Sequence, residues 1–136
     1  MVDVVALGEL LIDFTCQERD RAGYPTLIAN PGGAPGNFLA ALQAYGCKTA
    51  MLGKVGADAF GSLLLETLKS RKIDTRGVFL DPSVFTTLAF VTLDETGNRA
   101  FSFARKPGAD ICFTKDEVKQ THLIEDAAYF ISERLA

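Results

Sequence analysis

The stretch PGGAPGNFLAALQAYG, residues 31–46, contains a pair of glycines that leads directly into an apolar-periodic run. Gly32 and Gly33 can adopt positive φ and let a bound molecule approach the main chain. Pro35 suits the first turn of a helix, and the apolar residues after it recur at helical spacing up to the next glycine. Because free N–H groups at a helix start attract polar ligands, Asn37 is a candidate binding residue. A plain tight turn is the alternative interpretation.

Length and composition are typical of one folded domain. The chain has 136 residues, of which 48% are hydrophobic and 23% charged, enough for one hydrophobic core. A net charge of −3 without a basic run argues against a nucleic-acid partner, and no apolar run is long enough for a membrane span. Three scattered cysteines and one histidine indicate a reducing compartment and no metal site. We therefore expect a cytoplasmic protein.

Strands and helices alternate around the glycine pair. Val2–Leu7 and Lys48–Lys54 are short apolar runs, and with the intervening helix they predict a βαβ unit of a mostly parallel sheet. Asp58 fits the N-cap of a helix that extends to about Arg71, a role we favour over ligand binding. Further strands are predicted at 26–29, 77–80, 86–93, 100–104 and 127–132, and a capped helix at 114–120. This alternation predicts an α/β fold.

Polar side chains mark two further places in the pattern. Asp13 comes just past a buried strand, where open α/β sheets bind ligands; a strand-end cap is the alternative. Residues 86–104 form a predicted hairpin in which Phe101 and Phe103 face one side, either packing on a core or lining a cover over the sheet. Arg105 follows the hairpin directly. It either grips a hydroxylated or anionic ligand or is a solvated surface residue.

Four motifs follow one another along the chain: GELLID at 8–13, GGAPGN at 32–37, GKVGADAFG at 53–61 and FARKPGAD at 103–110. In this order they resemble the PfkB-type, or ribokinase-family, carbohydrate kinases, and most of all the bacterial fructokinases. The resemblance covers almost the whole chain but only the N-terminal portion of the family's usual length. It implies an incomplete ribokinase-like α/β fold over residues 1–136. A mostly parallel sheet would be flanked by helices, with a small β-sheet lid from about 14–29 and 88–104.

The resemblance also implies a sugar site between the lid and the core. The implied residues are Asp13, Gly32, Gly33, Asn37, Phe101, Phe103 and Arg105. The carboxylate and the amide would hydrogen-bond sugar hydroxyls, and the glycine pair would form the hinge. The arginine would reach the sugar from the lid side, and one or both aromatic rings would give an apolar wall. Closing the lid would exclude water from the site.

The catalytic part of the family pattern does not occur in these 136 residues. Family members place their catalytic base in a Gly-Ala-Gly-Asp segment of the C-terminal half, beside the ATP site. We therefore assign no catalytic residue here; ATP and Mg²⁺ are expected of full-length relatives, with neither site in this chain. The ending at 130–136, FISERLA, also departs from the Gly-Ser pair typical of fructokinases. Within it, Glu133 is a further candidate for a sugar contact.

The expected function is a fructokinase-like sugar kinase that transfers the γ-phosphoryl group of ATP to a sugar hydroxyl. This chain would supply the sugar-binding half. A truncated, non-catalytic sugar-binding or interaction module is the alternative, and 2-keto-3-deoxygluconate or a nucleoside are alternative substrates. Because a truncated sheet leaves an exposed edge and apolar surface, we expect a homo-oligomer or a complementing chain.

Overall fold

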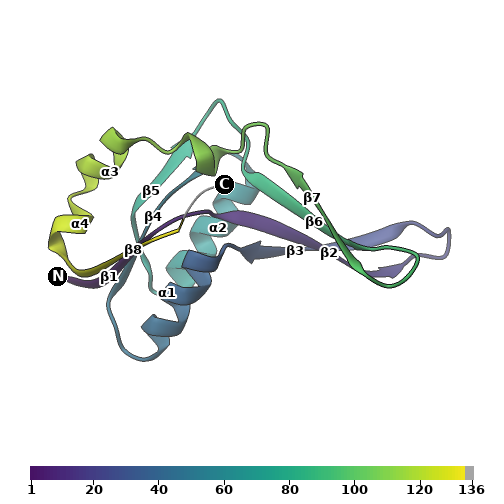
Figure 1. Ribbon diagram of the computed structural model, residues 1–136, viewed down its shortest axis with the longest axis horizontal. Coiled ribbons are helices and arrows are strands. Elements are labelled where there is room, and N and C mark those ends of the chain that lie inside the picture. Colours follow the sequence, from purple (N-terminus) through teal and green to yellow (C-terminus); the bar gives the residue numbers. More distant parts are fainter. Residues whose placement is uncertain (134–136) are drawn as a thin grey trace.

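The computed structural model contains two four-stranded sheets. It describes residues 1–133, so positions 134–136 of the FISERLA ending lie outside the described residues. The core sheet is parallel, in the order β5–β4–β1–β8, and the outer sheet is mixed, in the order β3–β2–β6–β7. The outer sheet projects away from the core (Figure 1). The core strands are β1 (Val2–Leu7), β4 (Thr49–Gly56), β5 (Asp74–Asp81) and β8 (Ala127–Ser132). The outer strands are β2 (Leu11–Arg19), β3 (Pro25–Gly32), β6 (Thr87–Leu93) and β7 (Arg99–Ala104).

Helices cover both faces of the core sheet (Figure 1). They are α1 (Ala34–Ala44), α2 (Ala59–Ser70), α3 (Lys115–Thr121) and α4 (Leu123–Asp126), with the 3₁₀ turn η1 (Ala109–Cys112) before α3. Leu39 of α1 and Leu64 of α2 pack with Met51 of β4 on one face. Leu123 of α4 packs with Leu52 of β4 on the other face. The predicted α/β architecture is therefore confirmed. No helix in residues 1–133 is long and apolar enough to span a bilayer.

Strand β4 occupies the buried centre of the core sheet. All eight of its residues are buried, which explains why its sequence is mostly small and apolar rather than alternating; Lys54 is the charged exception. Strands β1 and β5 pair with β4 on its two sides. Helix α1 precedes β4 in the chain, and helix α2 connects β4 to β5. Gly33 is the N-cap of α1, with φ of 113°, a backbone conformation that favours glycine. The glycine pair therefore starts the helix, as predicted.

The outer sheet differs from the sequence-based expectation. Asp13 was expected just past a buried strand, but it lies inside β2, whose pairing extends to Arg19. Only 26–29 was predicted as a strand in the polar segment that follows, whereas β3 runs from Pro25 to Gly32. Both strands are largely exposed toward their far ends. Because these ends have no buried face, hydrophobic alternation does not identify them, and this is why the extent of the strands was underestimated.

Two predicted helix caps are present. Asp58 accepts hydrogen bonds from the backbone N–H groups of Phe60, at 3.1 Å, and Gly61, at 2.8 Å. It also accepts from the backbone N–H of Thr86, at 2.9 Å, and from its hydroxyl, at 2.8 Å. Burial alone would raise the pKa of Asp58, but these hydrogen bonds outweigh it and lower that pKa. Thr114 caps α3 in a capping box, also as predicted.

Candidate functional site

One face of the outer sheet holds Asp13 and Phe103 in a single row. Asn30 of β3 pairs with Asp13 of β2, Asp13 pairs with Ala89 of β6, and Ala89 pairs with Phe103 of β7. Because directly paired residues in a sheet point to the same face, these four side chains share one surface. Two candidates that lie 90 residues apart in the sequence are thus brought together by strand register.

The adjacent row continues the same face. It consists of Ile28, Thr15, Val91 and Phe101, so the two phenylalanines do face one side, as predicted. Both rings are about half exposed, at 58% for Phe101 and 52% for Phe103, which means that they do not pack into a core of the described chain. A cavity of about 540 Å³ opens on this sheet. Its lining residues are Asp13, Thr15, Cys16, Gln17, Asn30, Val91, Thr92, Leu93, Arg99 and Phe101.

Asp13 is the titratable group at the base of this face. Partial burial raises its pKa, and the negative charge of Glu9 raises it further. Its carboxylate lies directly over the backbone of Gly32, so that a Cβ at position 32 would collide with the Asp13 Oδ2 atom. The group that closely approaches Gly32 in this structure is a side chain of the chain itself, and close approach of a bound molecule to Gly32 stays a prediction.

Asn30 is a site residue that the sequence analysis missed. Its side-chain nitrogen donates to the Thr15 hydroxyl at 3.1 Å, to the Ile28 carbonyl at 3.1 Å and to the Asp13 carbonyl at 3.3 Å. These bonds fix the amide beside Asp13. The available signal was the strand period of two, since Asn30 precedes Gly32 by two residues and so shares its face.

Arg105 is held by two carboxylates. Its Nη2 atom donates to Glu9 Oε2 and to Asp110 Oδ2, each at 2.7 Å, and its guanidinium carbon lies 5.7 Å from the centre of the Phe103 ring. Burial alone would lower the pKa of Arg105, but the bond to Glu9 and the charge of Asp110 outweigh it and raise that pKa. The arginine side chain is only 15% exposed, so the alternative of a solvated surface residue is wrong.

Asn37 lies elsewhere. Its exposed side chain lines a small cavity together with Gly32, with Thr67 of helix α2 and with Arg71 at the end of that helix. This is not the cavity that Asp13 lines. Gly32 lines the cavity of Asn37 and also lies against the Asp13 carboxylate. A shared role of Asn37 and Asp13 in binding one ligand stays a prediction.

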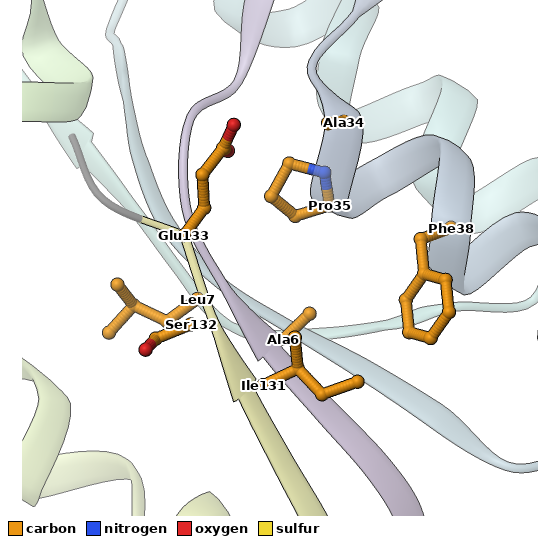
Figure 2. A pocket seen from close by; sticks show the side chains of 8 residues that line it. All are labelled: Ala6, Leu7, Ala34, Pro35, Phe38, Ile131, Ser132 and Glu133. Carbon is orange, nitrogen blue, oxygen red and sulfur yellow. The ribbon is translucent and has the colours of Figure 1, made fainter. Parts of the chain in front are cut away.

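A further cavity, of about 270 Å³, lies where β1 and β8 end beside the start of α1 (Figure 2). Its lining residues are Ala6, Leu7, Ala34, Pro35, Phe38, Ile131, Ser132 and Glu133. Glu133 is held there by its backbone N–H, which donates to the Leu7 carbonyl at 3.0 Å. Its buried Oε2 atom has no hydrogen-bond partner within residues 1–133. The carboxyl ends of parallel strands are the usual ligand-binding edge of such sheets, so Glu133 remains a candidate contact.

Comparison with known proteins assigns the family. The profile of the pfkB family carbohydrate kinases matches residues 1–135. The chain belongs to this family. Fructokinase-1 of Zea mays is 43% identical over 129 residues, which is 93% of this chain and 40% of the maize protein. A fructokinase of Solanum tuberosum is 41% identical with the same two coverages.

Solved structures of carbohydrate kinases share the fold. A fructokinase from Xylella fastidiosa superposes with a TM-score of 0.87 at 30% identity, covering 97% of this chain and 41% of its own. The same enzyme has also been solved with bound ATP, with a TM-score of 0.86 at 31% identity, covering 97% of this chain and 39% of its own. The fold of this pfkB-family chain is thus ribokinase-like, and the chain spans about 40% of the length of the relatives it matches.

The pKa of Asp13 leads to a pH-dependent stability prediction. Because folding raises this pKa, the folded state favours the neutral carboxyl, and the charge that Asp13 carries at higher pH opposes folding. Asp13→Asn should therefore increase the free energy of unfolding at pH 7. The gain should shrink as pH falls through the raised pKa toward the ordinary value near about 4. Urea unfolding at a series of pH values measures it.

Glu95→Gln is the matched control, since Glu95 is exposed in the turn between β6 and β7. This variant should unfold like the parent chain throughout the pH series. A loss of stability in Asp13→Asn at pH 7, or a gain that persists unchanged in acid, would contradict the electrostatic account of Asp13.

Proposed function

We propose that this chain is the sugar-binding part of a fructokinase-type sugar kinase, which transfers the γ-phosphoryl group of ATP to a sugar hydroxyl. The observation that carries the proposal is the row of Asn30, Asp13, Ala89 and Phe103 on one face of the outer sheet. A row of amide, carboxylate, small residue and aromatic ring offers both hydrogen-bonding groups and an apolar surface. Sugars present both hydroxyls and C–H faces, so this surface matches their chemistry.

Each part of the row has a role in the proposed complex. Asp13 accepts hydrogen bonds from two sugar hydroxyls, and a charged acceptor makes these stronger than neutral ones. Ala89 leaves room for the sugar ring between the carboxylate and the aromatic side chains. Phe101 and Phe103 cover an apolar face of the ring. Arg105, anchored beside Phe103, lies at the edge of the same surface and is positioned to reach the open end of the sugar.

The outer sheet is proposed to act as the lid, with residues 14–29 and 88–104 as its moving segments and Gly32 and Gly33 at the hinge. Its place at the side of the core sheet supports this assignment (Figure 1). A lid that closes over the sugar would exclude water and so limit wasteful hydrolysis of ATP. Residues 1–136 would then form the N-terminal part of one ribokinase-like domain.

We propose that ATP and Mg²⁺ bind outside the residues that the structure describes. No group of three or more His, Cys, Asp or Glu side chains in residues 1–133 could hold a metal ion. Lys54, the most buried lysine, is already paired with Glu117 at 2.7 Å and Asp81 at 3.7 Å. We assign no nucleotide contact and no catalytic base to these residues, and propose that a further chain segment or partner supplies them.

The edge of the core sheet supports a protein partner. Within the described residues, β8 pairs with β1 on one side and has no neighbouring strand on the other. Its side chains include Tyr129, Phe130 and Ile131, which are 70%, 44% and 44% exposed. Figure 2 shows Ile131 beside the apolar cavity that Phe38 also lines. An unpaired, apolar strand edge favours pairing with another chain, so we propose a homo-oligomer or a complementing chain.

Fructose is the proposed substrate because the named relatives are fructokinases. The cytoplasm is the proposed location, since the three cysteines, Cys16, Cys47 and Cys112, are free thiols. 2-Keto-3-deoxygluconate and a nucleoside are the competing ligands to include in every binding experiment.

Sugar binding and phosphoryl transfer should separate in this chain. We expect the purified chain to bind fructose weakly by calorimetry and to show no fructose-dependent ADP formation with ATP and Mg²⁺. Asp13→Ala should weaken fructose binding by about 100-fold or more, because two hydrogen bonds to a charged group contribute about 1.5–3 kcal/mol each.

Glu18→Ala is the matched control, since Glu18 lies on the same strand but does not line the cavity. It should bind fructose like the parent chain. Unchanged affinity in Asp13→Ala would remove Asp13 from the site. Tighter binding of the nucleoside or the keto sugar would replace fructose as the ligand, and turnover by the chain alone would show that it is catalytically complete.

The β8 edge should mediate self-association of the purified chain. Ile131→Lys should weaken the association by about tenfold or more, because it would bury an unpaired charge in the contact. Sedimentation velocity over a concentration series measures this. Leu93→Lys is the control, since Leu93 is 67% exposed at the far end of β6. Equal weakening by both variants, or a monomeric parent chain, would contradict an interface at β8.

A further inference from the structure

The chain passes between the core and the outer sheet four times. The connections are β1 to β2 through residues 8–10, β3 to α1 at Gly33, β5 to β6 through 82–86, and β7 to η1 through 105–108. Any movement of the outer sheet relative to the core must bend all four connections. Contacts among them therefore help to hold the outer sheet, together with the packing of Phe14 of β2 on Phe60 of α2.

A buried ion cluster joins the first and fourth of these connections and the start of β6. Arg105, just after β7, donates from Nη2 to Glu9 of the first connection and to Asp110 of η1, each at 2.7 Å. The Thr87 hydroxyl, at the start of β6, donates to the other Asp110 oxygen, Oδ1, at 2.6 Å. We call Glu9, Thr87, Arg105 and Asp110 the junction cluster.

Main-chain contacts bring the β3–α1 connection and the β5–β6 connection to the same cluster. Gly33 packs so closely on the Glu9 carbonyl that a Cβ there would collide with its oxygen. The backbone N–H of Ala109 donates to the Phe85 carbonyl at 3.0 Å. All four connections therefore contact the junction cluster or a residue next to it in the sequence.

Burial distinguishes this cluster from surface ion pairs. The Asp110 side chain is fully buried and that of Arg105 is 15% exposed, whereas Arg76, which pairs with Asp74 at the same 2.7 Å, is 68% exposed. A buried carboxylate that loses its cationic partner is strongly destabilising, whereas exposed pairs contribute little. The comparably buried pairs of Lys54 with Glu117 and Asp81 lie on the core sheet and helix α3. Among the described residues, the junction cluster is therefore the buried charged contact that bridges the two sheets.

We propose that Arg105 ties the outer sheet to the core, with Glu9, Thr87 and Asp110 as the residues that position it. Asp110 holds the guanidinium from the core side, and Thr87 orients Asp110. Glu9 holds the same guanidinium to the connection that leads into β2. Loss of any of them releases the outer sheet as a unit while the core sheet stays closed. The inference is independent of the proposed function, because it concerns a motion that occurs without sugar.

Hydrogen–deuterium exchange of the intact chain, read by peptide and without any sugar, tests this proposal. Asp110→Asn should speed exchange in β2 and β6 by about tenfold or more through local opening, and leave β4 unchanged. Thr87→Val should act in the same direction, because it frees Asp110 to move. The double variant should be no faster than Asp110→Asn alone, since both act through the same guanidinium.

Arg76→Gln is the control, an ion-pair deletion away from the junction, and it should leave exchange in the outer sheet unchanged. If Asp110→Asn does not fold, Glu9→Gln removes the partner at the more exposed side of the cluster and should give the same pattern. Faster exchange in β4 to the same extent as in β2 and β6 would show a general loss of stability and overturn the proposal. Unchanged exchange in all strands would overturn it as well.

Discussion

The packing of the Asp13 carboxylate on the backbone of Gly32 is the contact on which the proposed site depends. It joins β2 and β3 at the base of the outer sheet, and only a glycine leaves room for it. Partial burial and the nearby charge of Glu9 make the ionised form of Asp13 unfavourable. A ligand that donates hydrogen bonds to this carboxylate offsets that cost. In the proposed complex, the chain would therefore accept lower stability at the position that supplies a binding group.

Glu9 connects the proposed site to the junction between the sheets. Its charge raises the pKa of Asp13, and its carboxylate also accepts a hydrogen bond from Arg105. Arg105 in turn contacts Phe103, which stands in the same row as Asp13. If sugar binds at the outer sheet as proposed, its binding and the attachment of that sheet to the core would be linked through Glu9 and Arg105.

The core was predictable from the sequence, and the outer sheet was predictable only in part. Strand β4 is buried throughout and largely apolar, and Asp58 and Thr114 cap their helices as their sequence positions indicate. The alternation of residues 100–104 also placed Phe101 and Phe103 on one side. In contrast, β2 and β3 have polar, exposed ends, and hydrophobic pattern alone did not show their full length.

The pattern of residues also could not predict which side chains come together in the candidate site. Asp13, Ala89 and Phe103 meet because β2 and β6 are parallel neighbours, a pairing that no local signal encodes. The roles of Arg105 and Asp110 depend on a contact with Glu9 across 96 residues of sequence. Such long-range contacts follow from the fold as a whole. The family motifs pointed to most of these residues, but not to Asn30, and they implied a joint role for Asn37 and Asp13 that remains to be tested.

The central claim is that sugar binds on the face of the outer sheet that carries Asp13. Titration of the isotope-labelled chain with fructose, followed by the backbone amide signals in NMR spectra, tests it most directly. The account predicts shifts concentrated at Asp13, Asn30, Ala89 and Phe103, on four different strands. Shifts confined to the cavity around Asn37 and Arg71, or to the β8 edge near Ile131, would contradict it.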